Sequence, residues 1–122
     1  MSKANITVYG IPNCDTVKKA RAWLAAQGVD YTFHDFKKQG VPEAALDGWL
    51  ADAGWEKVLN RQGNTWRKLD PALQASVKDA ASARAIALAN PSAIKRPVVS
   101  WGGSRTTVGF DAALWDSLVK TA

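Results

Sequence analysis

The chain has one cysteine, Cys14, which stands in the polar, turn-forming segment Pro12-Asn13-Cys14-Asp15-Thr16. A thiolate is a strong nucleophile, and a cysteine at the start of a helix loses its proton readily because free N–H groups stabilise the negative charge. Asp15 opposes this charge, whereas the hydroxyl of Thr16 could donate a hydrogen bond to the sulfur. A lone cysteine is more often inert and buried, but these polar neighbours favour a reactive thiol.

The elements that position Cys14 follow from the pattern of apolar residues. Alternating side chains predict a strand over residues 6–10, and helical spacing predicts a helix from about Cys14 to Gln27, with Gly28 as its stop. The aromatic, alternating stretch Tyr31–Phe36 predicts a second strand. Cys14 is therefore expected at the junction of a strand and a helix.

The rest of the chain predicts a helical middle followed by a hairpin and a last helix. In order, these elements are a helix that begins at Pro42 and stops at Gly54, a helical region from Asp70-Pro71 to Asn90-Pro91, a strand over Val98–Trp101, a turn at Gly102-Gly103, a strand over Arg105–Phe110 and a helix capped by Asp111.

This order predicts an α/β fold. A helix that joins two short strands implies a right-handed parallel crossover, and the terminal hairpin adds antiparallel strands. The result is a thioredoxin-like, four-stranded mixed sheet flanked by helices, with a helical insertion in the middle of the chain. A length of 122 residues suits a single domain over 1–122.

The composition limits the classes of molecule that this protein is expected to bind. The net charge is +5, but the basic residues are scattered, so we expect a solvated basic surface or a small-anion site and no nucleic-acid partner. No apolar stretch approaches the roughly 20 residues of a membrane span, and Met1–Asn5 shows no signal-peptide pattern, so we expect a cytoplasmic protein and no membrane partner. A single cysteine, which cannot form an internal disulfide, also suits a reducing compartment.

Two motifs carry a family resemblance. The segment from Gly10 to Ala20 (GIPNCDTVKKA) and Ile94-Lys95-Arg96-Pro97-Val98-Val99 downstream resemble the ArsC/Spx family of arsenate-reductase-related proteins, and most closely its YffB-like members. The resemblance extends from about Ile6 to Lys120. It implies a glutathione-dependent thiol oxidoreductase of arsenate-reductase-like type, acting on a small oxyanion or a thiol as a monomer.

The resemblance also implies roles for individual residues. Cys14 is the catalytic nucleophile, and glutathione, helped by a glutaredoxin, regenerates it as co-substrate with no bound cofactor. Arg96 precedes a cis-proline and helps to bind the anion. The anion or the thiolate is further stabilised by Arg61 and Thr16, and glutathione is bound at Asn13 and Pro97. Guanidinium groups suit this task because paired N–H donors match tetrahedral oxyanions. His34, the only histidine, predicts no metal site.

Two departures from the family pattern bear on function. Arsenate reductases of this type carry a third arginine near the last helix, where this chain has Val108-Gly109-Phe110, with Arg105 two or three residues earlier. Spx-type transcriptional regulators carry a Cys-x-x-Cys pair, whereas the position three after Cys14 is Val17. A protein-binding regulator that docks on RNA polymerase without turnover is the alternative function.

Overall fold

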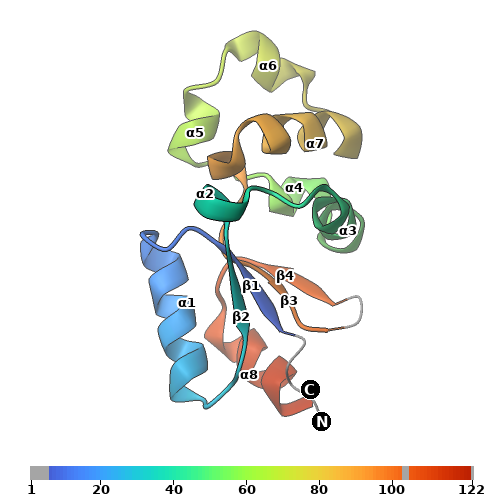
Figure 1. Cartoon of the computed structure of the whole chain (residues 1–122). Coiled ribbons are helices and arrows are strands. Elements are labelled where there is room, and N and C mark those ends of the chain that lie inside the picture. The colour runs from blue at the N-terminus through green and yellow to red at the C-terminus, as the bar shows by residue number, and fades with distance from the viewer. Residues whose placement is uncertain (1–5, 103–104, 122) are drawn as a thin grey trace. The chain divides into compact units, whose positions relative to one another are not determined.

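The computed structural model describes residues 6–102 and 105–121. The chain divides into two compact units. We call Met1–Gln39 with Arg96–Ala122 the sheet unit and Gly40–Lys95 the helical unit (Figure 1). The helical unit is the predicted insertion between the second and third strands.

The sheet unit contains a four-stranded mixed sheet in the order β2-β1-β3-β4. β1 pairs in parallel with β2, placing Gly10 opposite Asp35, and antiparallel with β3, placing Tyr9 opposite Val98. This arrangement confirms the predicted thioredoxin-like α/β fold. Its elements are β1 (Thr7–Gly10), α1 (Asp15–Ala26), β2 (Thr32–Asp35), α2 (Phe36–Gln39), β3 (Val98–Ser100), β4 (Thr106–Val108) and α8 (Ala112–Thr121).

Helices α1 and α8 cover one face of this sheet (Figure 1). Alternation along β1 directs Val8 to that face, and helical spacing directs Val17, Ala20 and Leu24 of α1 toward it. Trp115 of α8 is fully buried there, in edge-to-face contact with three further aromatic rings. The ring centroids lie at 6.0 Å for Trp23, 5.1 Å for Trp101 and 4.8 Å for Phe110.

The helical unit departs from the sequence prediction at several places, including two short helices between Gly54 and Asp70 that the pattern did not single out. Pro42 is the N-cap of the first helix and not its first helical residue. The helical region after Asp70 is broken because Asp79 begins a new helix, exchanging capping-box hydrogen bonds with Ser82. The elements are α3 (Glu43–Ala53), α4 (Trp55–Val58), α5 (Asn64–Arg67), α6 (Pro71–Ser76), α7 (Ala80–Ala89) and a 3-10 turn over Pro91–Ala93.

The predicted helix and strand ends are otherwise close to the observed ones. Gly54, at φ +92°, ends α3, and the Asp111 carboxylate accepts the N–H of Leu114 in the first turn of α8. The predicted hairpin turn includes Gly103, which lies outside the described residues, as does Met1–Asn5. Within the described part of the chain, no helix is long and apolar enough to cross a membrane.

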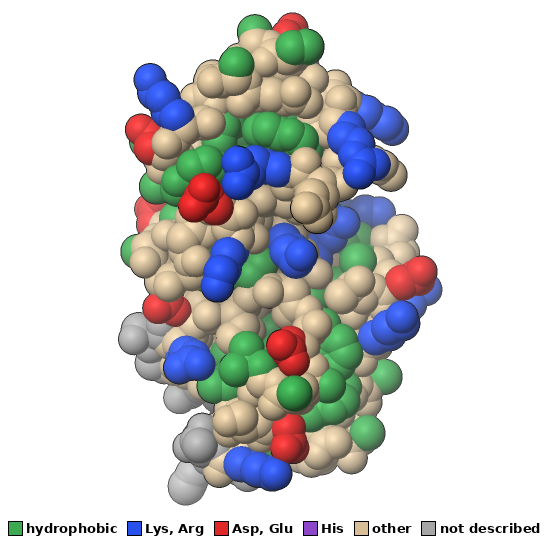
Figure 2. Space-filling model, turned by 180° about the vertical axis from the view of Figure 1, so that it is seen from behind, with side chains coloured by type: hydrophobic (Ala, Val, Ile, Leu, Met, Phe, Trp, Pro, Cys, Tyr) green, Lys and Arg blue, Asp and Glu red, His purple; other side chains and the backbone are tan. Residues whose placement is uncertain are grey.

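On the face of the molecule that Figure 2 shows, Lys and Arg side chains lie among neutral, hydrophobic and acidic ones. Such mixing is typical of a solvated surface, and the expected absence of a nucleic-acid partner stays a prediction.

Candidate functional site

Cys14 lies at the turn between β1 and α1, as the sequence predicted. Its N–H donates to the carbonyl of Ile11 (3.2 Å), and its own carbonyl accepts the N–H of Lys18 (2.9 Å), so Cys14 is the N-cap of α1. The side chain is half-buried and the thiol is free. The free N–H groups of the first turn of α1 therefore face the sulfur.

Gly10 allows this turn to lie close to the sheet. A Cβ atom at position 10 would lie 2.9 Å from Cγ2 of Val17, which is fully buried in the first turn of α1. Only a glycine lets the end of β1 approach the helix so closely. The residue type at position 10 thus determines where the first turn of α1, and with it Cys14, is held.

The surroundings of Cys14 favour its thiolate. Partial burial raises the pKa of the thiol, but stabilisation of the thiolate by the backbone N–H of Val17, the Arg96 guanidinium and the backbone N–H of Thr16 outweighs it. The positive charge of Arg96 acts in the same direction, and the pKa of Cys14 lies below its ordinary value. The Cys14 side chain makes no cap hydrogen bond, so the N–H groups of the first turn stabilise the thiolate through their partial positive charge.

Arg96 approaches Cys14 from the start of β3. The Arg96-Pro97 peptide bond is cis, which confirms that prediction. Pro97 is fully buried and its carbonyl accepts the N–H of Gly109 (2.9 Å). One lone pair of that carbonyl is therefore already engaged within the protein, and glutathione binding at Pro97 stays a prediction.

The other predicted site residues lie at different places. Asn13 and Thr16 are exposed beside Cys14, and Thr16 acts on the sulfur through its backbone N–H. The predicted hydrogen bond from the Thr16 hydroxyl stays a prediction. Arg61 belongs to the helical unit, where it is exposed, lies 3.8 Å from the Glu56 carboxylate and stacks over the ring of Trp55 at 5.1 Å. Its predicted contact with Cys14 stays a prediction.

Arg105 lies far along the sheet from Cys14. It precedes β4, where Thr106 pairs with Ser100 and Ser100 in turn with Thr7, at the opposite end of β1 from the cysteine. Val108 pairs with Val98 at the end near Cys14. Arg105 therefore does not supply the third arginine of arsenate reductases, and an aliphatic side chain stands at that position.

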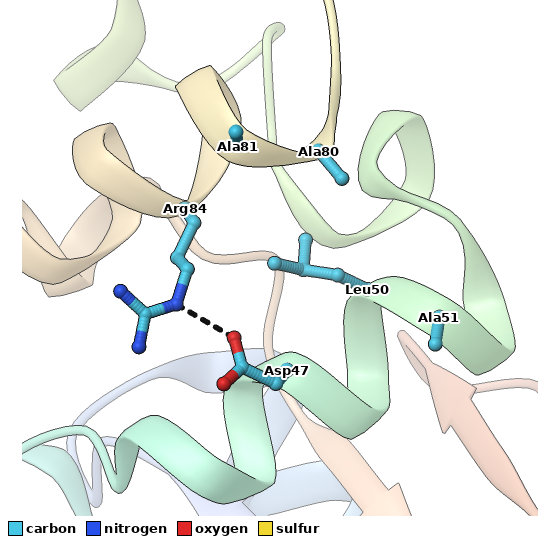
Figure 3. Close-up of a pocket in the computed structure, with 6 residues that line it drawn as sticks. All are labelled: Asp47, Leu50, Ala51, Ala80, Ala81 and Arg84. Carbon is cyan, nitrogen blue, oxygen red and sulfur yellow. Dashed lines mark hydrogen bonds and ion pairs between the residues drawn. The ribbon is translucent and has the colours of Figure 1, made fainter.

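Two other features carry no chemistry of their own. The ring of His34 packs beside Tyr9 with centroids 5.1 Å apart, and no group of three metal-ligating side chains occurs among residues 6–102 and 105–121. The helical unit has a cavity of about 290 Å³ with apolar walls and an ion pair between Asp47 and Arg84 (2.6 Å) at its edge (Figure 3). The cavity is lined by Asp47, Leu50, Ala51, Ala80, Ala81 and Arg84.

Sequence reasoning placed free N–H groups beside Cys14 but did not single out that of Val17, which lowers the pKa of the thiol most. Its side chain carries no sign of this role, because every helix presents such groups in its first turn. The position of Cys14 before α1 was the signal that could have identified it.

Comparisons with known proteins converge on one family. A family model described as the ArsC family matches residues 9–118. The solved structure of a YFFB protein is 48% identical, with 93% of this chain and 98% of that chain covered at a TM-score of 0.89. An arsenate reductase (ArsC) related protein from Brucella melitensis is 50% identical, with 94% of both chains covered at a TM-score of 0.72. The global transcriptional regulator Spx of Streptococcus pyogenes is 28% identical over 87% of this chain and 78% of its own.

Proposed function

The chain belongs to the ArsC family, and from this membership and the geometry at Cys14 we propose that it is a glutathione-dependent thiol oxidoreductase. The observation that carries the proposal is the set of donors around one sulfur. Two backbone N–H groups and the Arg96 guanidinium hold the pKa of Cys14 down against its partial burial. A thiolate of this kind is the reacting species in thiol–disulfide exchange.

The proposed reaction is an exchange of sulfur partners. The Cys14 thiolate attacks one sulfur of glutathione disulfide, a Cys14–glutathione disulfide forms, the original S–S bond breaks, and one glutathione thiolate leaves. A second external thiolate then attacks the mixed disulfide and releases Cys14. Because the chain has no second cysteine, this resolving thiol must come from another molecule.

A disulfide substrate suits the site better than arsenate. An arsenate-binding site of the expected type uses three arginines, but Arg105 lies at the far end of the sheet and Val108 occupies the near end. Among the described arginines of the sheet unit, Arg96 is the one that acts on the sulfur. One guanidinium beside a thiolate supports attack on a disulfide, whose transition state spreads one negative charge over the sulfurs.

The test is a titration of the Cys14 thiolate by its ultraviolet absorbance, paired with mass spectrometry after exposure to glutathione disulfide. We expect a depressed pKa and a rapid, single glutathione adduct that a Cys14→Ser variant cannot form. Arg96→Ala should raise the pKa and slow adduct formation, whereas Arg105→Ala, an arginine of the same unit far from Cys14, should change neither. A pKa at or above about 8.5, the unperturbed value, with no adduct would refute the proposal.

A regulator without turnover is the second candidate, because the Spx relative aligns over most of the chain. Val17 is fully buried where Spx-type proteins carry their second cysteine, so oxidation within the chain cannot switch it. Affinity capture from lysate of the native host distinguishes the two functions. Stoichiometric RNA polymerase with wild type and Cys14→Ser alike would support the regulator, because docking does not need the thiol and catalysis does.

A further inference from the structure

Helix α2 lies at the same end of the sheet as Cys14. Strands β1 and β2 are parallel and Gly10 pairs with Asp35, so the segments that follow both strands leave the sheet at one edge. The turn to Cys14 follows β1, and α2 follows β2 (Figure 1). The Arg96-Pro97 turn joins them there, because Val98 pairs with Tyr9 near the end of β1.

Helix α2 is anchored by local contacts although it has only four residues. The side chain of Phe36 is buried, and the Asp35 carboxylate, itself only 9% exposed, accepts the N–H of Lys37 (2.8 Å). The N–H of Asp35 donates to the side-chain oxygen of Gln39 (3.2 Å). These contacts fix the backbone on which two consecutive lysines, Lys37 and Lys38, stand exposed.

The charge at this edge of the sheet unit is positive. Lys18 follows Cys14 by one helical turn and therefore shares its side of α1. The exposed Asp15 opposes this charge, but Lys19 stands four residues later on the same side of the helix. Asp35, the other carboxylate, is buried under α2 and occupied by the N–H of Lys37.

Arg96 and the two lysines act on different partners. Arg96 is among the groups that lower the pKa of Cys14, and no lysine of the described residues is. Lys37 and Lys38 are not among the groups that lower the pKa of Cys14. Their charge is available to a molecule that approaches the sulfur from solvent.

Resting on the proposed exchange chemistry, we propose that Lys37 and Lys38 are specificity-determining residues that favour disulfides carrying carboxylates close to the S–S bond. In water, a lysine about 10 Å from a doubly negative disulfide changes its reaction rate about threefold at low salt. Two lysines together give about tenfold. The same charges disfavour a doubly positive disulfide and leave a neutral one unaffected.

The experiment compares three disulfides with the full-length protein at low salt. Dithiodipropionate carries two negative charges, hydroxyethyl disulfide is neutral and cystamine carries two positive charges. For the Lys37→Gln/Lys38→Gln variant, we expect the rate with dithiodipropionate to fall about tenfold, the rate with hydroxyethyl disulfide to stay within about twofold and the rate with cystamine to rise. The effect should shrink when the ionic strength is raised to about 0.5 M, where the Debye length is only a few Å.

The matched control removes two positive charges from the far end of the same unit. Arg105 precedes β4, and Lys120 lies in the last turn of α8, where it pairs with Asp116 (2.9 Å). The Arg105→Gln/Lys120→Gln variant should react with all three disulfides at wild-type rates. The thiolate titration is repeated for each variant, so that a change in the amount of thiolate is not mistaken for a change in attraction.

The outcomes separate this inference from the proposed function. No reaction of wild type with any of the three disulfides would refute the exchange chemistry itself. In a second outcome, wild type reacts with all three disulfides while the lysine variant changes all three rates by the same factor, or while the control variant changes the rates as the lysine variant does. Either result would overturn the role of Lys37 and Lys38 and leave the exchange chemistry standing. If the Lys37→Gln/Lys38→Gln variant fails to fold, the single Lys38→Gln variant and the Lys37→Glu/Lys38→Glu variant provide the same comparison. Cystamine should be the fastest of the three substrates of the Lys37→Glu/Lys38→Glu variant.

Discussion

A methyl group added at Gly10 would test the close approach of β1 to α1 on which the position of Cys14 depends. The Cβ of a Gly10→Ala variant would lie 2.9 Å from Cγ2 of Val17 and 3.5 Å from Cγ1. Val17 is fully buried, and a β-branched side chain in a helix has one strongly preferred rotamer, so it cannot turn away. Either the strand or the first turn of α1 must move.

The expected cost follows from the overpacking of a dense core. Inserting one methyl group into a well-packed site destabilises a protein by about 1–3 kcal/mol. For a chain of 122 residues, each kcal/mol lowers Tm by about 4 °C, so we expect a fall of about 4–12 °C. Gly10 is not at a positive φ, so backbone strain adds nothing to this cost.

A double-mutant cycle isolates the contact. Val17→Ala alone removes two buried methyl groups and should cost about 1–3 kcal/mol. The Gly10→Ala/Val17→Ala variant has no clash and refills part of the cavity, so it should be no less stable than Val17→Ala. Urea unfolding of the four proteins then gives a coupling of about 1–3 kcal/mol in favour of the double variant.

The pKa of Cys14 can be measured in the same four proteins. If the first turn of α1 moves in Gly10→Ala, the N–H groups of Thr16 and Val17 move away from the sulfur, and the pKa of Cys14 should rise. The double variant should restore it. A Gly10→Ala protein that unfolds at the wild-type urea concentration, or costs that simply add in the cycle, would show that the strand and helix do not touch at this point.

Three further predictions concern the glycines of α3, the cap of α7 and the pH dependence of stability. Gly48→Ala should stabilise the protein by about 0.5–1 kcal/mol, because Gly48 lies inside α3 with open space around it. Gly54→Ala should destabilise the protein by about 1–3 kcal/mol, because φ is +92° at that position. Urea unfolding of both variants measures these changes, and equal effects on stability would contradict the prediction. Asp79→Ala should lower Tm and Asp79→Asn should largely retain it, because asparagine also accepts the N–H of Ser82; a calorimetric Tm that is equal for both would exclude capping as the cause. The pKa of Cys14 is lower in the folded than in the unfolded chain, so the thiolate stabilises the protein above the unfolded pKa, and this contribution is lost as pH falls through the folded pKa. The free energy of unfolding of wild type, relative to that of Cys14→Ser, should therefore increase with pH across that range. A difference that does not change with pH would argue against the pKa shift.

The strands, the main helices and the position of Cys14 could be predicted because they depend on local patterns. Alternation identified β1 and β2, and the strand-to-helix junction placed Cys14 where N–H groups are free. The cis bond before Pro97 came from family resemblance, and the structure confirms it.

Features that depend on a single hydrogen bond, or on contacts between segments distant in sequence, were harder to predict from the sequence. Helix α2 was missed because Phe36 reads as the end of an aromatic strand, whereas the buried Asp35 carboxylate turns the chain at that residue. The break before α7 depends on the capping box of Asp79 and Ser82 within a run of good helix formers. The role of Arg61 depends on contacts between segments distant in sequence, which no local pattern encodes.

The aromatic cluster around Trp115 gives the sheet unit an optical signature. Trp23 and Trp101 lie 6.0 and 5.1 Å from Trp115, close enough for their excited states to couple and produce strong near-ultraviolet circular dichroism. The other three tryptophans, Trp49, Trp55 and Trp66, belong to the helical unit. Loss of the coupled band therefore reports melting of the unit that carries Cys14, while far-ultraviolet dichroism reports the helices of both units. Heating the protein and following both bands would show whether the two units unfold together or one after the other.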